Sequence, residues 1–262
     1  MNKNELVVCG MTAVQTRFQR DPGSMLRLFF DEPTSKKIGN LCKALAAARK
    51  VYRCVEPNEL ELISGTVHHG GIVAVVTAPI LRAPLPADLT RWAEARTPVL
   101  LLDRIGNAHN LGAIARTAAF FGVEHIVLPF SPIAALPGEA AYRVAEGGLD
   151  FVTVWRVGQL GRFIKDLIAV GYDVIGAASR GGRADAAAQT ERPMAVVLGN
   201  EEHGLAAEVA AECTRLVTLT GSGRIESLNV SVAGSILLWE CFGKRPPSPA
   251  AAAMASPRAP AR

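Results

Sequence analysis

The chain has 262 residues, of which 49% are hydrophobic and 20% charged, with a formal net charge of +4. This length and composition exclude fibrous and disordered proteins and suit one large or two modest globular domains. The basic excess lies at the two ends, with 11 Lys and Arg against 7 Asp and Glu in residues 1–82, and 4 against none in residues 244–262. Basic ends favour a polyanionic partner.

No apolar run approaches the roughly 20 residues that a membrane helix needs, and the first residues lack the pattern of a signal peptide. We therefore expect a cytoplasmic protein without a membrane segment. The five cysteines are scattered, with none at CxxC spacing, which argues against a disulfide framework and against a zinc cluster. We expect no metal site.

The first part of the chain alternates strand and helix patterns. Apolar strands are predicted at residues 6–9, 25–30, 51–55 and 72–76, and an Ala- and Leu-rich helix at residues 36–49. Three prolines within residues 78–86 predict a linker. We place a first domain over residues 1–78 and a linker over residues 79–96.

The second part continues the alternation and ends in a change of composition. Strands are predicted at residues 99–102, 125–128, 151–154, 173–175, 195–198 and 216–219, with helices at 111–121, 160–170, 205–211 and about 228–242. Wholly apolar strands between helices indicate parallel sheets covered on both faces, so the fold class is α/β in both halves. We place the second domain over residues 97–243, and the Pro, Ala and Ser composition predicts a disordered basic tail over residues 244–262.

One polar segment follows the first strand of the second domain. The strand ends at Asp103, a loop containing Gly106 follows, and a helix begins near Asn110, which we predict as its N-cap. Arg116 lies off the apolar stripe of this helix, so it can face the loop ends where parallel strands deliver ligands. An ordinary surface arginine is the alternative.

Two further segments carry polar and glycine residues that are not typical of a purely structural part of an α/β fold. Gly199, Asn200 and Glu201 directly follow a buried strand, where glycine lets a ligand approach the backbone; the alternative is an ordinary strand-to-helix turn. Leu219 leads into a Gly/Ser loop and then into a helix start crowded with Ser227, Asn229 and Ser231; the alternative is a serine cap on a glycine-rich turn.

Other chemistries do not match the sequence. The chain has no GxxxxGK[ST] phosphate loop, no HExxH and no GxSxG. Gly221-Ser222-Gly223 begins a dinucleotide fingerprint, but Glu226 stands where that fingerprint has Gly or Ala. A nicotinamide-binding domain therefore lacks its main signature.

The three segments together resemble the signature motifs of the SpoU (TrmH-like) RNA methyltransferases of the SPOUT superfamily. The matching runs are residues 110–118, 198–205 and 227–233, in the family's order, within residues 97–243. Residues 5–78 resemble, more loosely, the family's N-terminal substrate-binding domain, which has a small ribosomal-protein-like α/β fold. The chain departs from the family at Gly70, where the family has Gln, and at Thr220, where it has Pro.

The resemblance implies a trefoil-knotted parallel-sheet domain, a homodimer with each active site near the interface, and S-adenosylmethionine as cofactor. It places the cofactor in a backbone pocket with contacts at Ala178, Gly199, Leu219 and Leu228. The catalytic positions that it implies are Asn110, Arg116, Glu201, Ser227 and Asn229.

The implied reaction is methylation of a ribose 2′-hydroxyl of rRNA or tRNA without a metal. In this reaction we assign Arg116 to the target phosphate and to the developing charge, with its side chain directed toward the loops of Gly199 and Ser227. Two alternatives stay open: methylation of a base atom, and an RNA-binding module that has lost catalysis. Analysis of the modified nucleoside separates ribose from base methylation.

Overall fold

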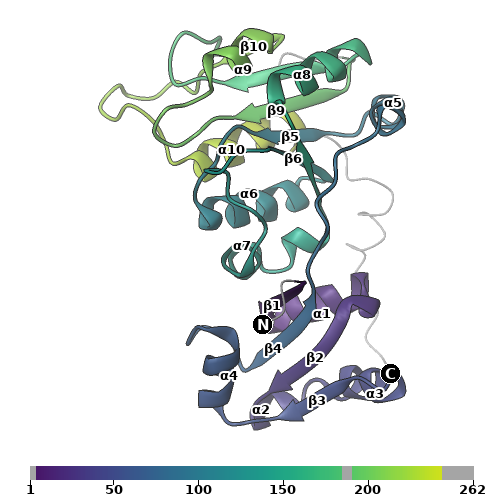
Figure 1. The fold of residues 1–262 in the computed structure, drawn as a ribbon. Coiled ribbons are helices and arrows are strands. Elements are labelled where there is room, and N and C mark those ends of the chain that lie inside the picture. The colour runs from purple at the N-terminus through teal and green to yellow at the C-terminus, as the bar shows by residue number, and fades with distance from the viewer. Residues whose placement is uncertain (1–3, 185–190, 244–262) are drawn as a thin grey trace, which may run out of the picture.

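A computed structural model describes residues 4–184 and 191–243, which form two α/β domains joined by an extended segment (Figure 1). The first domain lies at the bottom of Figure 1, in purple and blue. Its elements are β1 (Glu5–Cys9), α1 (Met11–Arg20), η1 (Pro22–Ser24), β2 (Met25–Phe30), α2 (Glu32–Ser35), α3 (Gly39–Ala47), β3 (Val51–Cys54), α4 (Pro57–Ser64) and β4 (Ile72–Thr77).

The sheet of the first domain is mixed, with the strand order β1-β4-β2-β3. Only β2 and β3 are parallel, so the predicted parallel sheet is wrong here. The reason is that β4 enters between β1 and β2 and runs antiparallel to both. At the edge, β3 is exposed along its whole length, including Val51 and Tyr52, although its apolar pattern predicted a covered strand.

The second domain has a six-stranded, wholly parallel sheet, as predicted, with the order β10-β8-β9-β5-β6-β7. Its elements are α5 (Pro86–Glu94), β5 (Val99–Leu102), α6 (Ala108–Phe120), β6 (His125–Pro129), α7 (Glu139–Ala145), η2 (Gly148–Asp150), β7 (Thr153–Val157), α8 (Leu160–Ala169), β8 (Asp173–Ala177), β9 (Met194–Leu198), α9 (Ala207–Glu212), β10 (Arg215–Val217), α10 (Val230–Leu238) and a π-helical turn η3 (Trp239–Gly243).

Alternate residues of β5 separate two cores. Leu100 and Leu102 lie in the cluster of α6, α7 and α10, whereas Val99 and Leu101 lie in the cluster of α5, α8 and α9. Successive side chains of a strand point to opposite faces, so each face of the sheet carries one layer of helices. This is the covered parallel sheet that the uninterrupted apolar strands indicated.

Helix α5 lies inside the predicted linker. Its Leu89 and Trp92 are buried in the core of the second domain, and the Trp92 ring stacks on His125 at 4.2 Å between centroids. Proline at the start of α5 is compatible with a helix, because the first helical N–H has no partner to lose. The segment between the domains that has neither helix nor strand is therefore only residues 78–85.

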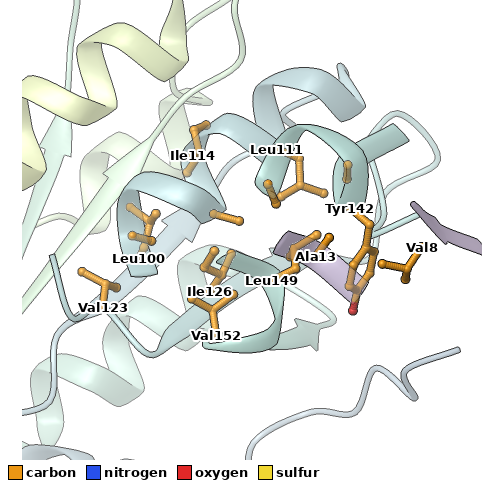
Figure 2. Packing of buried hydrophobic residues seen from close by; sticks show 14 of the residues in the cluster. Val8, Ala13, Leu100, Leu111, Ile114, Val123, Ile126, Tyr142, Leu149 and Val152 are labelled. Atoms are coloured by element: carbon orange, nitrogen blue, oxygen red, sulfur yellow. The ribbon is translucent and has the colours of Figure 1, made fainter. Parts of the chain in front are cut away.

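The two domains share a continuous core. Val8 and Ala13 of the first domain pack in the same cluster as Tyr142 and Leu149 of the second (Figure 2). A buried ion pair crosses the same boundary, with Arg17 Nη2 at 2.7 Å from Asp150 Oδ1, and Arg17 also donates to the Tyr142 hydroxyl at 2.8 Å. The two domains thus share buried apolar side chains, and a buried ion pair crosses their boundary.

Two expectations stay predictions: the trefoil knot and the disordered basic tail. The tail, residues 244–262, lies outside the described residues. Over the residues that the structure does describe, no helix is long and apolar enough to cross a membrane.

Candidate active site

The loops that carry the three motifs emerge at one edge of the parallel sheet. The strands β10, β8, β9 and β5 are successive neighbours, so the chain leaves all four at their shared carboxyl edge. Ligands of open parallel α/β sheets bind at this edge. The loop after β5 leads to Asn110, the loop after β9 contains Glu201, and the loop after β10 contains Ser227 and Asn229.

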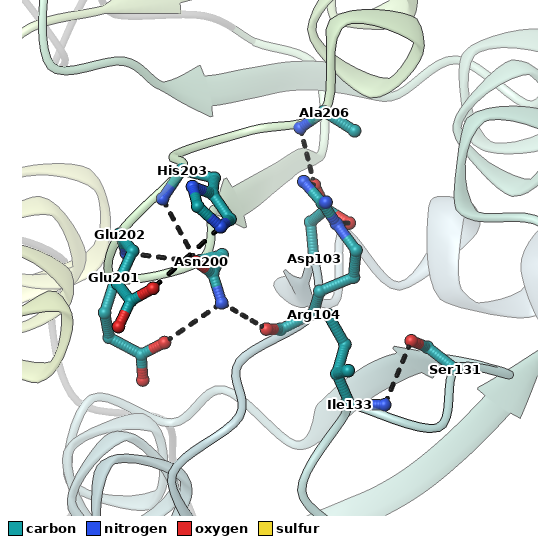
Figure 3. Close-up of polar contacts among 9 residues, drawn as sticks. All are labelled: Asp103, Arg104, Ser131, Ile133, Asn200, Glu201, Glu202, His203 and Ala206. Atoms are coloured by element: carbon teal, nitrogen blue, oxygen red, sulfur yellow. Dashed lines mark hydrogen bonds and ion pairs between the residues drawn. The ribbon is translucent and has the colours of Figure 1, made fainter.

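A buried carboxylate ties the first two loops together. Asp103 is 3% exposed, its Oδ2 accepts from the Ala206 backbone N–H at 2.7 Å, and its Oδ1 accepts from Arg104 Nε at 3.0 Å (Figure 3). In return, Asn200 Nδ2 donates to the Arg104 carbonyl at 2.9 Å. We had predicted no role for Asp103 or Asn200 from the sequence. The available signal was a carboxylate placed directly after an apolar strand.

The loop after β9 is closed by its own hydrogen bonds. Asn200 and Gly204 exchange backbone hydrogen bonds of 3.0 and 2.9 Å. Asn200 Oδ1 also accepts from the Glu202 and His203 N–H groups (Figure 3). A Cβ at position 199 would lie 2.3 Å from the Gly204 carbonyl carbon and the Leu205 nitrogen. Glycine at 199 is therefore required by the turn itself.

Three of the predicted catalytic residues meet in one polar cluster. Asn110 Nδ2 donates to Glu201 Oε1 at 2.7 Å, and Asn229 Nδ2 donates to Asn110 Oδ1 at 3.2 Å. Glu201 Oε2 lies 3.4 Å from Asn200 Nδ2. One residue from each motif thus contributes to a single hydrogen-bonded chain, which we name the Asn110 cluster: Asn110, Glu201 and Asn229.

The N-cap of α6 is Asn107 and not Asn110, which corrects our prediction. The Asn107 Oδ1 accepts from the His109 and Asn110 backbone N–H groups at 2.8 and 3.4 Å. Asn110 therefore lies in the first turn of α6. Because its side chain does not cap the helix, the side-chain amide is available to donate to Glu201. Asn229 keeps a capping role, because its Oδ1 accepts from Ser231 N at 2.9 Å at the start of α10.

Arg116 lies apart from the Asn110 cluster. It follows Asn110 by six residues, which is about 240° around a helix axis at 3.6 residues per turn. Its Nη2 lies 3.0 Å from Glu146 Oε2, and the two side chains are 56% and 55% exposed. Within the described chain Arg116 forms no hydrogen bond or ion pair with the loops of Gly199 or Ser227, so the expected approach is not observed.

The third loop is the most exposed part of the site. Residues 220–229 are all exposed and form neither helix nor strand, and Ser227 has no hydrogen-bond partner among the residues that the structure describes. Leu219 packs against the core, whereas Leu228 is 51% exposed. The Ala178 N–H donates to the Val217 carbonyl at 2.9 Å, and Arg180 pairs with Glu226 at 3.0 Å, so the loops after β8 and β10 lie side by side.

Comparison with known families settles what kind of protein carries these motifs. The defining pattern of the SpoU rRNA methylase family matches residues 97–239. This chain belongs to the SpoU rRNA methylase family. Residues 7–81 match a second pattern, the substrate-binding domain of RNA 2′-O ribose methyltransferases.

Individual relatives cover most of the chain. It is 31% identical to a 23S rRNA (guanosine-2′-O-)-methyltransferase RlmB from Nitrosomonas europaea, over 90% of each chain. It is 32% identical to a tRNA/rRNA methyltransferase, YfiF, of Escherichia coli O157:H7, over 90% of this chain and 67% of the relative. A solved structure of an AdoMet-bound rRNA methyltransferase from Sinorhizobium meliloti shares the fold, with a TM-score of 0.74 at 22% identity over 90% of this chain and 86% of the other.

Proposed function

We propose that this SpoU-family protein transfers a methyl group from S-adenosylmethionine to a ribose 2′-hydroxyl of rRNA or tRNA. The observation that carries the proposal is the Asn110 cluster, in which three motifs far apart in the chain form one hydrogen-bonded chain. The relative named as a 23S rRNA (guanosine-2′-O-)-methyltransferase supports the ribose as acceptor, because it aligns with 90% of this chain.

The residues at the carboxyl edge of the sheet fit a nucleoside cofactor. The half-buried Leu219 and the exposed Leu228 and Ile225 offer apolar surface to a base, beside the polar Asn110 cluster. We assign the cofactor to Ala178, Gly199, Leu219 and Leu228, where backbone groups and apolar side chains suffice. When bound, S-adenosylmethionine supplies an activated methyl group.

The Asn110 cluster orients the acceptor in this proposal. Each asparagine side-chain amide has two N–H donors, and one from Asn110 and one from Asn229 is used within the cluster. The second N–H of each is available to a ribose oxygen. Because Glu201 fixes the Asn110 amide with a short charge-assisted bond, these donors are preorganised, and preorganised donors stabilise charge that develops on an oxygen.

Arg116 and Ser227 complete the set on chemical grounds. A guanidinium can hold two phosphate oxygens at once and stabilise the charge that grows on the neighbouring 2′-oxygen, and it is too basic to lose its own proton. We assign Arg116 to the phosphate beside the target ribose. Ser227, which lies on the exposed loop, is assigned to the cofactor loop and the ribose.

We also propose that the protein is a homodimer that associates through its second domain. Val232 and Ile236 of α10 are 48% and 37% exposed, Trp239 of the following turn η3 is 51% exposed, and Phe120 at the end of the neighbouring α6 is 82% exposed. Apolar side chains gathered on one surface mark an interaction site. Because rRNA and tRNA are found in the cytoplasm, we assign the protein to that compartment.

The decisive experiment identifies the methylated atom. The protein is incubated with S-adenosylmethionine and with rRNA or tRNA from cells that lack it, and the digested nucleosides are analysed by mass spectrometry. We expect a 2′-O-methylated nucleoside, absent when the Asn110→Ala, Glu201→Ala double variant replaces the wild type. Methylation found only on a base contradicts the assigned acceptor, and RNA binding without any methylation identifies a module that has lost catalysis.

A further inference from the structure

The segment that follows α7, residues 146–150, is fixed from both domains. A Cβ on Gly147 would lie 2.9 Å from Thr16 Oγ1 of the first domain, and a Cβ on Gly148 would lie 2.7 Å from the Cα of Arg116. Asp150 forms the buried ion pair with Arg17. These contacts leave little freedom to the backbone, so residue 146 has a defined place beside Arg116.

Glu146 occupies that place in an unusual conformation. It is the C-cap of α7, with φ 44° and ψ 47°, in the left-handed region that glycine or asparagine normally takes at a helix end. A glutamate there costs free energy that glycine avoids, because its Cβ crowds the backbone. Backbone strain that persists beside a functional residue indicates a role for the strained side chain.

The side chain of Glu146 uses this conformation to reach one guanidinium. Its Oε2 lies 3.0 Å from Arg116 Nη2, and both side chains are more than half exposed. An ion pair this exposed contributes little to folding stability, so stability does not account for the strain. What the pair does change is the availability of Arg116 to other anions.

We propose that Glu146 pairs with Arg116 in the RNA-free enzyme and takes the place of a phosphate of the target RNA. Only RNA that is also docked at another surface of the protein then displaces Glu146 from Arg116. The inference rests on the proposed function, in which Arg116 binds the phosphate beside the target ribose. It names Glu146 as a specificity-determining residue.

Glu146 and an RNA phosphate compete for one guanidinium. A carboxylate and a phosphate accept hydrogen bonds from the same N–H groups, and the apparent affinity of RNA falls with the fraction of protein in which Arg116 is unoccupied. RNA that is held only by weak contacts to its sugar-phosphate backbone does not displace Glu146, so it does not contact Arg116. A docked target RNA does contact Arg116, because docking presents its phosphate at high effective concentration.

The test measures binding of non-target RNA by full-length variants. A labelled uridine homopolymer is titrated by fluorescence anisotropy over a series of KCl concentrations. For Glu146→Gln we expect about two- to five-fold tighter binding, and a log K against log salt slope that is steeper by about 0.7, the value for one added phosphate contact on a single strand. Glu146→Gly, which also relieves the backbone strain, should show the same shift.

Matched variants show whether the effect acts through Arg116. Glu212→Gln removes an equal charge from the Lys165–Glu212 pair, whose side chains are 64% and 32% exposed, on the opposite layer of helices and should leave the slope unchanged. In an Arg116→Ala background, Glu146→Gln should change neither affinity nor slope. An unchanged slope in Glu146→Gln, or a change that persists without Arg116, overturns the proposal.

The outcome is separable from that of the proposed function. If Arg116→Ala keeps near-normal methyl transfer, the catalytic assignment of Arg116 is wrong, whatever RNA binding by the single and double variants at positions 116 and 146 shows. If Arg116→Ala loses methyl transfer but RNA binding by these variants shows no coupling between the two residues, only the role of Glu146 is wrong.

Discussion

At the scale of single residues, the site depends on asparagines with divided tasks. Asn107 caps α6 and thereby leaves the Asn110 amide for Glu201, whereas Asn229 both caps α10 and donates to Asn110. Buried Asp103 supports them by joining the loops after β5 and β9. Asn107 and Asp103 therefore have structural roles: Asn107 caps a helix, and Asp103 joins two loops of the site.

We assign Arg116 to the phosphate beside the target ribose, and its substitution tests this assignment. We expect Arg116→Ala to leave S-adenosylmethionine affinity within a few-fold of wild type and to lower turnover on the order of 10², the effect of losing one preorganised charge-stabilising donor. Arg116→Lys should rescue poorly, because a point charge cannot replace the planar fork. Calorimetry and a methyl-transfer assay measure the two quantities, with exposed Arg162→Ala as the control. Near-normal turnover in the alanine variant would falsify the assignment.

The buried carboxyl of Asp150 predicts a pH effect on stability. Burial raises the pKa of Asp150 to about 6, against the opposing effect of Arg17. The folded protein therefore takes up a proton at a higher pH than the unfolded chain, and Asp150 contributes more to the free energy of unfolding as the pH falls through 6. From pH 7.5 to 5 this contribution should rise by about 1 kcal/mol.

Chemical denaturation of wild type and Asp150→Asn at several pH values measures this effect. The Asp150→Asn variant cannot titrate at this position. The unfolding free energy of the wild type should therefore rise relative to that of the variant as the pH falls. Parallel pH profiles for the two proteins would show that Asp150 keeps an ordinary pKa.

At the scale of elements, the start of α6 carries Asn107, which caps the helix, and Asn110, which we assign to the reaction. Asn107→Ala removes the cap and should lower stability by about 1 kcal/mol. Asn110→Ala leaves the cap intact, so it should change stability little while lowering turnover. Urea unfolding and the transfer assay are run on both variants. Equal stability losses would mean that the capping assignment is wrong.

At the scale of the whole molecule, the shared core limits how the predicted RNA-binding role of the first domain can be tested. Deleting residues 1–82 would expose Tyr142 and Leu149 and leave Asp150 without Arg17, so charge substitutions are the cleaner test. Lys36, Lys37 and Lys43 are exposed on and beside α3. Replacing all three by Gln should weaken RNA binding and flatten its salt slope by about 2, with cofactor affinity unchanged.

A control for this charge test removes two exposed basic residues from the second domain. Arg162→Gln with Lys165→Gln on α8 should leave the salt slope near that of the wild type. If the first-domain variant keeps its slope, the RNA docks on another surface.

The dimer is tested through its proposed interface. We expect sedimentation at micromolar concentration to show a dimer, and Ile236→Glu with Trp239→Glu to shift it to a monomer, because charges on a covered apolar face are costly to bury. Leu62→Glu, at an 85% exposed position of the first domain, is the control and should stay dimeric. A monomeric wild type contradicts the proposal.

Patterns along the chain determined the class and most elements of this fold. Uninterrupted apolar strands predicted the covered parallel sheet of the second domain, since a strand buried on both faces needs apolar side chains at every position. The three motifs also singled out Asn110, Glu201 and Asn229, which the structure brings together in one hydrogen-bonded cluster; their role in the reaction stays a prediction.

Tertiary structure decided what depends on contacts between distant segments. The sequence could not show that β4 lies antiparallel between β1 and β2, that β3 is an exposed edge, or that α5 packs on the second domain, because strand order is set by long-range pairing. The partner of Arg116 was hidden for the same reason. Glu146 lies 30 residues further along the chain, and only the packing of α7 and Gly148 against α6 brings its carboxylate to the guanidinium.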